Sequence, residues 1–179
     1  VELNVTELLQ APATLELPLP SGARIVATRT SVERRGGSDL VWRGTLPDDG
    51  RVTLTVHDGL LAGTVEVEGV RYAIVPQGER RHALLEAAPG AGPGCGGAVA
   101  ANTPARTAAS RARSAAAVAA GETPTLDLFA VYTAAAREAS GGTDEMVTLL
   151  HAAVDHMNTA SIDSLVDMHV RLVATAEVD

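Results

Sequence analysis

The sequence contains a single cysteine and no lysine. Cys95 alone cannot form a disulfide within the chain, so it is a free thiol, a metal ligand or a thiol linked to a partner. All 14 basic residues are arginine, and the more numerous acidic residues give a net charge of −8. Because phosphate binding needs a concentrated basic face, this composition disfavours nucleic acid as a partner.

Long apolar runs are also absent. No stretch approaches the roughly 18 to 20 apolar residues of a membrane-spanning helix, so we expect no membrane span. No charged and apolar leader precedes Val1, and we therefore expect a secretory signal to be absent or already removed. The 179 residues, 46% of them hydrophobic, are enough for one globular domain or two small ones.

Charge and composition divide the chain into three regions. Residues 1–88 carry nine arginines against twelve acidic residues (net −3), residues 89–124 carry three against one (+2), and residues 125–179 carry two against nine (−7). We expect a β-rich domain over 1–88, a flexible linker over 89–124 and a separate structural unit over 125–179.

Apolar and polar residues alternate over residues 52–74, which predicts an antiparallel β meander in the first region. Asp58-Gly59 and Glu68-Gly69 stand between successive strands, where glycine provides the positive φ of tight hairpins. Earlier in the chain we expect strands over 23–30 and 39–46, joined through the loop Arg34-Arg35-Gly36-Gly37, an edge segment containing Pro18 and Pro20, and a core position for Trp42.

The second region is rich in Ala, Gly, Pro, Ser and Thr and has too few large apolar side chains to form a core. We therefore expect a mobile linker, within which the alanine- and arginine-rich residues 104–120 can become helical. Arg111 and Arg113 are candidate processing sites for a basic-specific protease, since cleavage in a mobile segment needs no unfolding. The alternative is that these arginines are merely solvated.

The third region changes from strand pattern to helix pattern and back. The apolar run 126–133 is typical of a strand covered on both faces. Gly141-Gly142 interrupts the chain before an amphipathic helix that starts at Thr143 and extends to about Ala160. Residues 167–178 predict a second strand, which gives a β-α-β unit and an overall α+β fold class. So small a unit buries little core, and we expect it to be the incomplete start of a larger α/β domain.

Two blocks of the sequence resemble reprolysin-like zinc metallopeptidases of the metzincin group, in their bacterial branch. Residues 126–179 resemble the start of the catalytic domain, with a first strand of the form D-x-x-x-V-Y-T-x-A-A-R, a Gly-Gly turn and a strand containing R-L-V. Residues 42–86 are similar to the pro-region. The matching positions are Asp127, Val131, Tyr132, Thr133, Ala135, Ala136, Arg137, Gly141, Gly142, Asn158, Arg171, Leu172 and Val173 in the first block, and Gly63, Gly69, Tyr72, Ile74 and Pro76 in the second.

The zinc-binding signature of that family, H-E-x-x-H-x-x-G-x-x-H, is missing, and the sequence contains no His-Glu pair. We therefore expect the chain to bind no catalytic zinc and to cleave nothing by itself. The resemblance implies that the signature follows Asp179, in the remainder of the catalytic domain. It also implies that the full-length protein is a secreted endopeptidase acting on protein or peptide substrates.

The resemblance gives Cys95 a candidate role as the inhibitory zinc ligand of the latent form. Pro-regions of related peptidases carry a cysteine switch, and Pro93-Gly94-Cys95-Gly96 matches its Pro-x-Cys-Gly pattern. A thiolate is a soft anionic ligand that holds zinc well, and a glycine-rich loop can enter a narrow cleft. The alternative is an incidental exposed thiol in a linker.

His151, Asp155 and His156 form the pattern H-x-x-x-D-H on the expected helix, and this spacing places His151 and Asp155 on one face as candidate metal ligands. The alternative is the polar flank of an amphipathic helix. We favour this alternative because the resemblance places no ligand on this helix. His57 and His82 lie at strand ends, with no partner that the sequence identifies.

The sequence thus favours the N-terminal portion of a secreted zinc metalloendopeptidase precursor, which the pro-region keeps latent through Cys95. One alternative is a complete, non-catalytic module that binds a partner protein, which predicts that residues 125–179 fold alone or on that partner. Another is a pro-region that alone inhibits or chaperones a separate protease. It predicts zinc-dependent inhibition in trans that is lost in Cys95→Ala.

Overall fold

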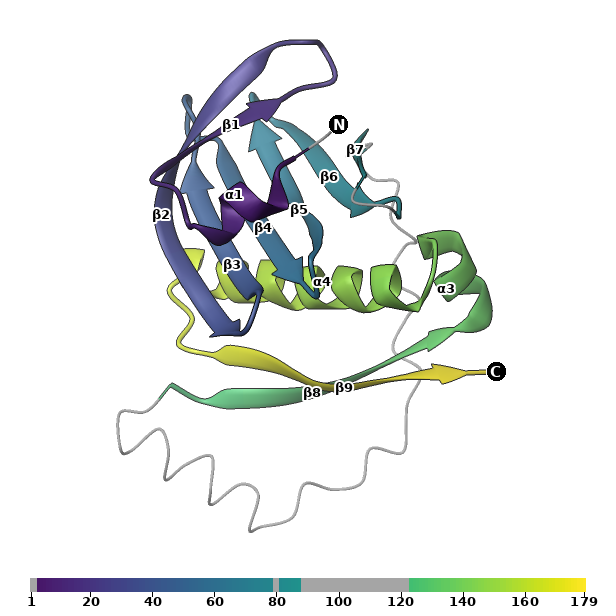
Figure 1. The fold of residues 1–179 in the computed structure, drawn as a ribbon. Coiled ribbons are helices and arrows are strands. Elements are labelled where there is room, and N and C mark those ends of the chain that lie inside the picture. The colour runs from purple at the N-terminus through teal and green to yellow at the C-terminus, as the bar shows by residue number, and fades with distance from the viewer. Residues whose placement is uncertain (1–2, 79–80, 88–122) are drawn as a thin grey trace.

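The computed structural model describes residues 3–78, 81–87 and 123–179, which form an α+β fold (Figure 1). An antiparallel sheet forms one layer, a long helix crosses one of its faces, and a pair of parallel strands lies beyond that helix. None of the helices in these segments combines the length and the apolar character needed to cross a membrane. Nearly all of the predicted linker lies outside the described residues, so its mobility stays a prediction.

The first layer is a seven-stranded sheet in which each strand pairs antiparallel with the next along the chain, so the predicted meander is confirmed. Its first strand lies at one edge, as predicted for the segment that contains Pro18 and Pro20. The opening helix and the seventh strand were not predicted. The bounds are α1 Val5–Leu9, β1 Thr14–Pro18, β2 Arg24–Gly36, β3 Asp39–Thr45, β4 Arg51–His57, β5 Leu60–Val67, β6 Val70–Pro76 and β7 His82–Glu86.

Strand β2 is longer than the sequence pattern indicated. It continues past the predicted end at residue 30 to Gly36, so Arg34 and Arg35 belong to a strand and the prediction that they lie in a loop is wrong. The physical reason is the pairing with β3, which runs from Thr28 opposite Thr45 to Gly36 opposite Asp39. As a result the Arg35 side chain stands on the sheet.

The two predicted hairpin turns form as their residues require. Asp58 and Gly59 have φ values of 47° and 79°, and Glu68 and Gly69 have values of 52° and 76°. Two successive residues with positive φ match the right-handed twist of the flanking strands. These turns fix the register of β4, β5 and β6, so that alternate side chains point to the same face.

The apolar core lies on the α1 face of the sheet. Trp42 is fully buried there, as predicted, and its indole Nε1 donates a hydrogen bond to the Pro12 carbonyl oxygen at 3.0 Å. A Cβ atom on Gly44 would lie 2.5 Å from this indole, so the ring needs a glycine beneath it. The core cluster consists of Leu8, Leu15, Leu17, Ala27, Leu40, Trp42, Leu46, Val52, Leu54, Val56, Leu61, Val65 and Ile74.

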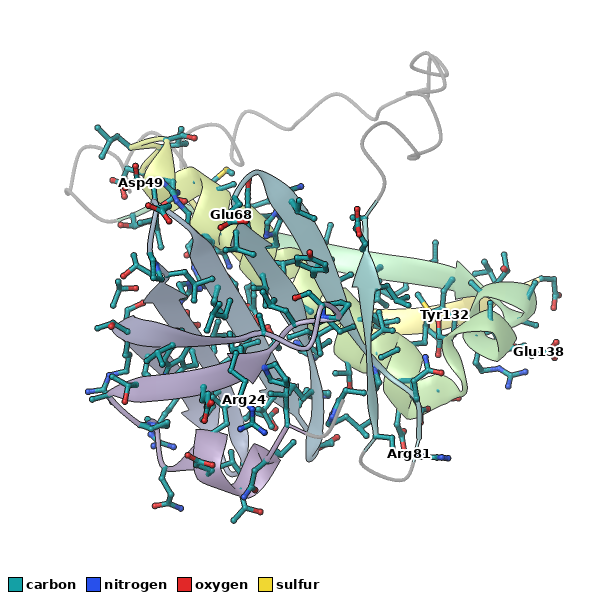
Figure 2. All side chains as sticks on the ribbon, turned by 90° about the horizontal axis from the view of Figure 1, so that it is seen from above. Arg24, Asp49, Glu68, Arg81, Tyr132 and Glu138 are labelled. Atoms are coloured by element: carbon teal, nitrogen blue, oxygen red, sulfur yellow. The ribbon has the colours of Figure 1, made fainter. Side chains whose placement is uncertain are left out.

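The C-terminal unit consists of β8 Thr125–Thr133, α3 Ala134–Ser140, α4 Thr143–Asp163 and β9 His169–Val178. Strands β8 and β9 pair in parallel, which confirms the predicted β-α-β arrangement. Helix α3 was not predicted, although Thr133 caps it by accepting a hydrogen bond from the Ala136 amide, and Gly141 ends it at a φ of 100°. Figure 2 places Tyr132 and Glu138 at the α3 end of the unit.

Helix α4 packs between the two sheets, against β4 and β5 on one side and β9 on the other (Figure 1). Asn158 joins it to β9, because its side chain donates to the Val170 carbonyl oxygen at 2.8 Å and accepts from the Val170 amide at 2.7 Å. The buried residues of α4 are Thr148, Val154, Asp155 and Asn158. Three of the four are polar, so the predicted apolar stripe does not account for how this helix is held.

The outer face of the β8–β9 pair, turned away from α4, carries apolar side chains. Phe129, Val131 and Val173 are 56%, 54% and 50% exposed, respectively. Strand β8 was expected to be covered on both faces. Within the described residues, it is covered on one face only. Parallel strands are normally covered on both faces by other elements.

Candidate functional site: the interface between the sheet and helix α4

The residues that the sequence singled out for zinc and for processing fall in one unplaced segment. Cys95, Arg111 and Arg113 lie outside the described residues, and their roles stay predictions. The histidines and the aspartate of the H-x-x-x-D-H pattern are placed, however: His151 and Asp155 contact polar residues of the sheet, and His156 lines a cavity between α4 and the sheet. The site is built from them.

Four residues of α4 meet the sheet in a row that we call the polar ladder. They are spaced every fourth residue, so they share one side of the helix, and each contacts a polar residue of β2, β3 or β4. The pairs are His151 with His57, Asp155 with Arg35 and Thr55, Thr159 with Arg43, and Asp163 with Arg51.

Asp155 is the central member of the ladder, and its side chain is 0% exposed. One carboxylate oxygen forms an ion pair with the Arg35 guanidinium, and the other accepts a hydrogen bond from Thr55 Oγ1 at 2.7 Å. Burial raises the pKa of Asp155, against the opposing effects of Arg35 and Thr55. A carboxylate buried this far is tolerated only while these partners stay in place. The interpretation of Asp155 as part of the polar flank of an amphipathic helix does not describe a residue that is buried against the sheet.

A second acidic residue holds the two central arginines in position. Glu33 lies 3.0 Å from Arg35 and 3.5 Å from Arg43, measured between charged atoms. Burial acts to raise the pKa of Glu33, but the hydrogen bond from Arg35 and the charges of both arginines hold it below its usual range. Arg43 can then donate from Nε to the Thr159 hydroxyl at 2.9 Å. The centre of the ladder is thus a connected network of charges and hydrogen bonds.

One end of the ladder is a pair of imidazole rings. The rings of His57 and His151 lie with their centroids 4.0 Å apart and their planes inclined by 32°. His57 Nδ1 lies 2.8 Å from an Asp39 carboxylate oxygen, whereas no described carboxylate lies within ion-pairing distance of His151. Burial, the neighbouring His57 and Arg35 lower the pKa of His151 to about 4. His151 is therefore neutral near pH 7.

The opposite end of the ladder is open to solvent. Arg51 and Asp163 form an ion pair, but their side chains are 58% and 39% exposed. An exposed pair of this kind contributes between about 0 and 1 kcal/mol. The strength of the ladder therefore lies at Asp155 and not at this end.

Asp39, His57 and Asp58 are the one group of described residues close enough to hold a metal ion together, with ligand atoms within 4.8 Å of one another. Both Asp39 oxygens are already engaged, one by His57 Nδ1 at 2.8 Å and the other by the Asp58 amide at 3.1 Å. These bonds tie β3 to the hairpin that follows β4. We therefore assign the group a structural role.

A cavity of about 230 Å³ lies beside the ladder, between α4 and strands β4 to β6. Its walls are mostly apolar and include Gly63 and Ala73 from the sheet and Leu149 and Ala152 from the helix. A Cβ atom at Gly63 would lie 2.2 Å from the Thr53 carbonyl oxygen, so that position admits only glycine. Small residues on both sides thus line a space that no side chain fills.

Sequence reasoning found the ladder only in part. The pattern drew attention to His151 and Asp155 as metal ligands or as the polar flank of an amphipathic helix, and neither interpretation describes what they contact. A signal is present, because His151, Asp155, Thr159 and Asp163 recur every four residues while Arg35, Arg43 and Arg51 recur every eight. Recognising it requires knowing that α4 lies across the sheet where side chains of β2, β3 and β4 reach it, which no local pattern reveals.

Comparison with known proteins identifies no relative of this chain. No family model, curated protein or solved structure matches this chain. The site is therefore interpreted from its own geometry and chemistry.

Proposed function

We propose that this chain is the N-terminal portion of a secreted zinc metalloendopeptidase precursor. The β sheet of residues 1–88 is its pro-region, the following segment carries Cys95 as an inhibitory zinc ligand, and residues 125–179 begin the catalytic domain. The observation that carries the proposal is the polar ladder, through which the sheet of the first region binds helix α4 of the third region.

The ladder supports the proposal because it joins the two regions that the resemblance assigns to pro-region and enzyme. A pro-region has to recognise its own catalytic domain specifically. A buried charge with defined partners suits that task, since a helix without a carboxylate at the position of Asp155 would leave Arg35 without its buried partner on that helix. Shape and apolar area alone would distinguish less sharply between the pro-region's own catalytic domain and other proteins.

The C-terminal unit supports the proposal in a second way. Positions that match the family pattern contact one another: Arg171 donates to both carboxylate oxygens of Asp127 at 2.9 and 3.0 Å, and Asn158 binds the backbone of β9. The bare apolar face of β8–β9 is what the start of a larger doubly covered sheet would present. Both features fit a unit that continues into further strands and helices.

The residues of this chain do not supply a catalytic zinc site. In an enzyme of this family zinc activates the water that attacks the peptide carbonyl. The sequence contains no His-Glu pair, and the Asp39 group is already used by a hairpin, so these residues do not fit a catalytic zinc site. The chain's own contribution in the proposal is to fold the enzyme's first elements and keep the enzyme latent.

Two experiments test the proposal. The coding sequence after Asp179 is expected to continue in frame into H-E-x-x-H-x-x-G-x-x-H, and a stop codon there would contradict a catalytic role. In the full-length precursor, Cys95→Ala should give peptidase activity before processing, while Ser110→Ala in the same segment should stay latent. Unchanged latency in Cys95→Ala would remove Cys95 from the proposal. A stop codon would instead favour a non-catalytic binding or inhibitory module.

A further inference from the structure

The histidine end of the ladder places two titratable rings across the boundary between the two regions. His57 comes from β4 and His151 from α4, and their ring centroids are 4.0 Å apart. The His57 side chain is only 18% exposed, and His151 is half-buried. A positive charge on His151 would therefore interact electrostatically with the neighbouring groups of the sheet and would be poorly hydrated.

The charged and titratable groups around His151 are distributed unevenly. Arg35 of β2 lines the same small cavity as His57, His151 and Asp39. Asp39 of β3 and Asp58 of the following turn lie against His57, with contacts of 2.8 and 3.6 Å to its two ring nitrogens. The nearest carboxylates are thus committed to His57, while His151 faces an imidazole and a guanidinium.

We propose that His151 makes the contact between the sheet and α4 acid-sensitive, so that the helix packs less tightly against the sheet when the pH falls from about 7 to about 5. A proton on His151 places a cation against Arg35 and His57 in a half-buried space. The contact is relieved when α4 moves away and His151 becomes hydrated. Acid thereby weakens the ladder at the end next to its buried ion pair.

The direction follows from proton linkage. Burial, His57 and Arg35 hold the pKa of His151 near 4 in the docked state, against 6.5 for a free histidine. The released helix therefore binds a proton that the docked helix excludes, and the contact is at full strength above about pH 6.5 and weakens toward about pH 4. Asp155 acts in the opposite direction, because burial raises its pKa and its protonation in place favours the docked state. The test therefore varies His151 and keeps Asp155 throughout.

Hydrogen–deuterium exchange of the α4 amides tests the proposal in the whole chain. After correction for intrinsic exchange, protection of α4 relative to β4 should fall about tenfold between about pH 7 and about pH 5 in the wild type. His151→Gln should abolish this dependence. His156→Gln, on the same helix but outside the ladder, should retain it. Equal protection at both pH values, or the same loss in His151→Gln, would overturn the proposal.

A second measurement covers the case in which His151→Gln itself loosens the helix. The ring resonances of His151 can be titrated directly in the wild type, and the midpoint should lie well below 6.5. A midpoint at or above 6.5 would overturn the proposal whatever the variant does. The inference concerns the contact between sheet and helix, so it can fail while the precursor proposal holds, and the reverse is also true.

Discussion

The sheet of residues 3–87 and the C-terminal unit of residues 123–179 bury different kinds of side chain. The sheet encloses thirteen apolar residues in one cluster around Trp42, with hairpins whose geometry is set locally. The longest element of the C-terminal unit buries three polar residues and one valine. A region with its own apolar core can fold by itself, whereas a helix whose buried groups are polar depends on the partners that satisfy them.

The largest expected effect in this comparison is the loss of the sheet's core. Trp42→Ala should lower the free energy of unfolding by about 3 to 5 kcal/mol, because it removes a fully buried indole and leaves a cavity. Urea unfolding followed by circular dichroism measures this, and α4 should unfold together with the sheet. Val26→Ala, at a 54% exposed position of β2, is the control and should change stability by less than about 0.5 kcal/mol. An equal effect of both changes would contradict the assigned core.

Asp155→Ala should have the next largest effect. It leaves the Arg35 guanidinium without its buried partner and removes the acceptor of Thr55, which should cost about 3 kcal/mol. Asp163→Ala removes the exposed member of the same ladder and should cost no more than about 1 kcal/mol. The two variants are compared by urea unfolding at neutral pH. Similar losses would mean that the ladder is not anchored at Asp155.

Two valines of β9 sharpen the comparison within the C-terminal unit. Val170 is 1% exposed and Val173 is 50% exposed. Val170→Ala should cost about 2 kcal/mol, whereas Val173→Ala should change stability by less than about 0.5 kcal/mol. Thermal unfolding of both variants checks this. A large effect at Val173 would show that the outer face of β8–β9 is covered in solution.

Much of the sheet could be predicted from the sequence because its signals are local. Alternation marks the strands, and Asp58-Gly59 and Glu68-Gly69 mark the hairpins, each within a few residues. The prediction of a loop at Arg34 and Arg35 was wrong because the pairing of β2 with β3 extends β2 beyond the residues that its sequence pattern indicated. Local propensity yields to cross-strand pairing at such positions.

The site could be predicted less well because its partners are far apart along the chain. Asp155 and Arg35 are separated by 120 residues, and nothing near Asp155 in sequence indicates that a carboxylate there will be buried. Hydrophobic periodicity assigns polar residues of a helix to solvent, and that rule fails where a neighbouring sheet supplies arginines. Cys95 stays a prediction, since it lies outside the described residues.

The central claim is that the sheet holds the C-terminal unit through the polar ladder, and separately produced fragments test it most directly. Residues 1–87 should unfold cooperatively when alone, whereas residues 123–179 should show little helix until residues 1–87 are added. Asp155→Ala in the second fragment should weaken that association about a hundredfold, in line with the loss of a buried ion pair. A fragment 123–179 that is helical and cooperatively folded alone, or that binds equally well with and without Asp155, would contradict the claim.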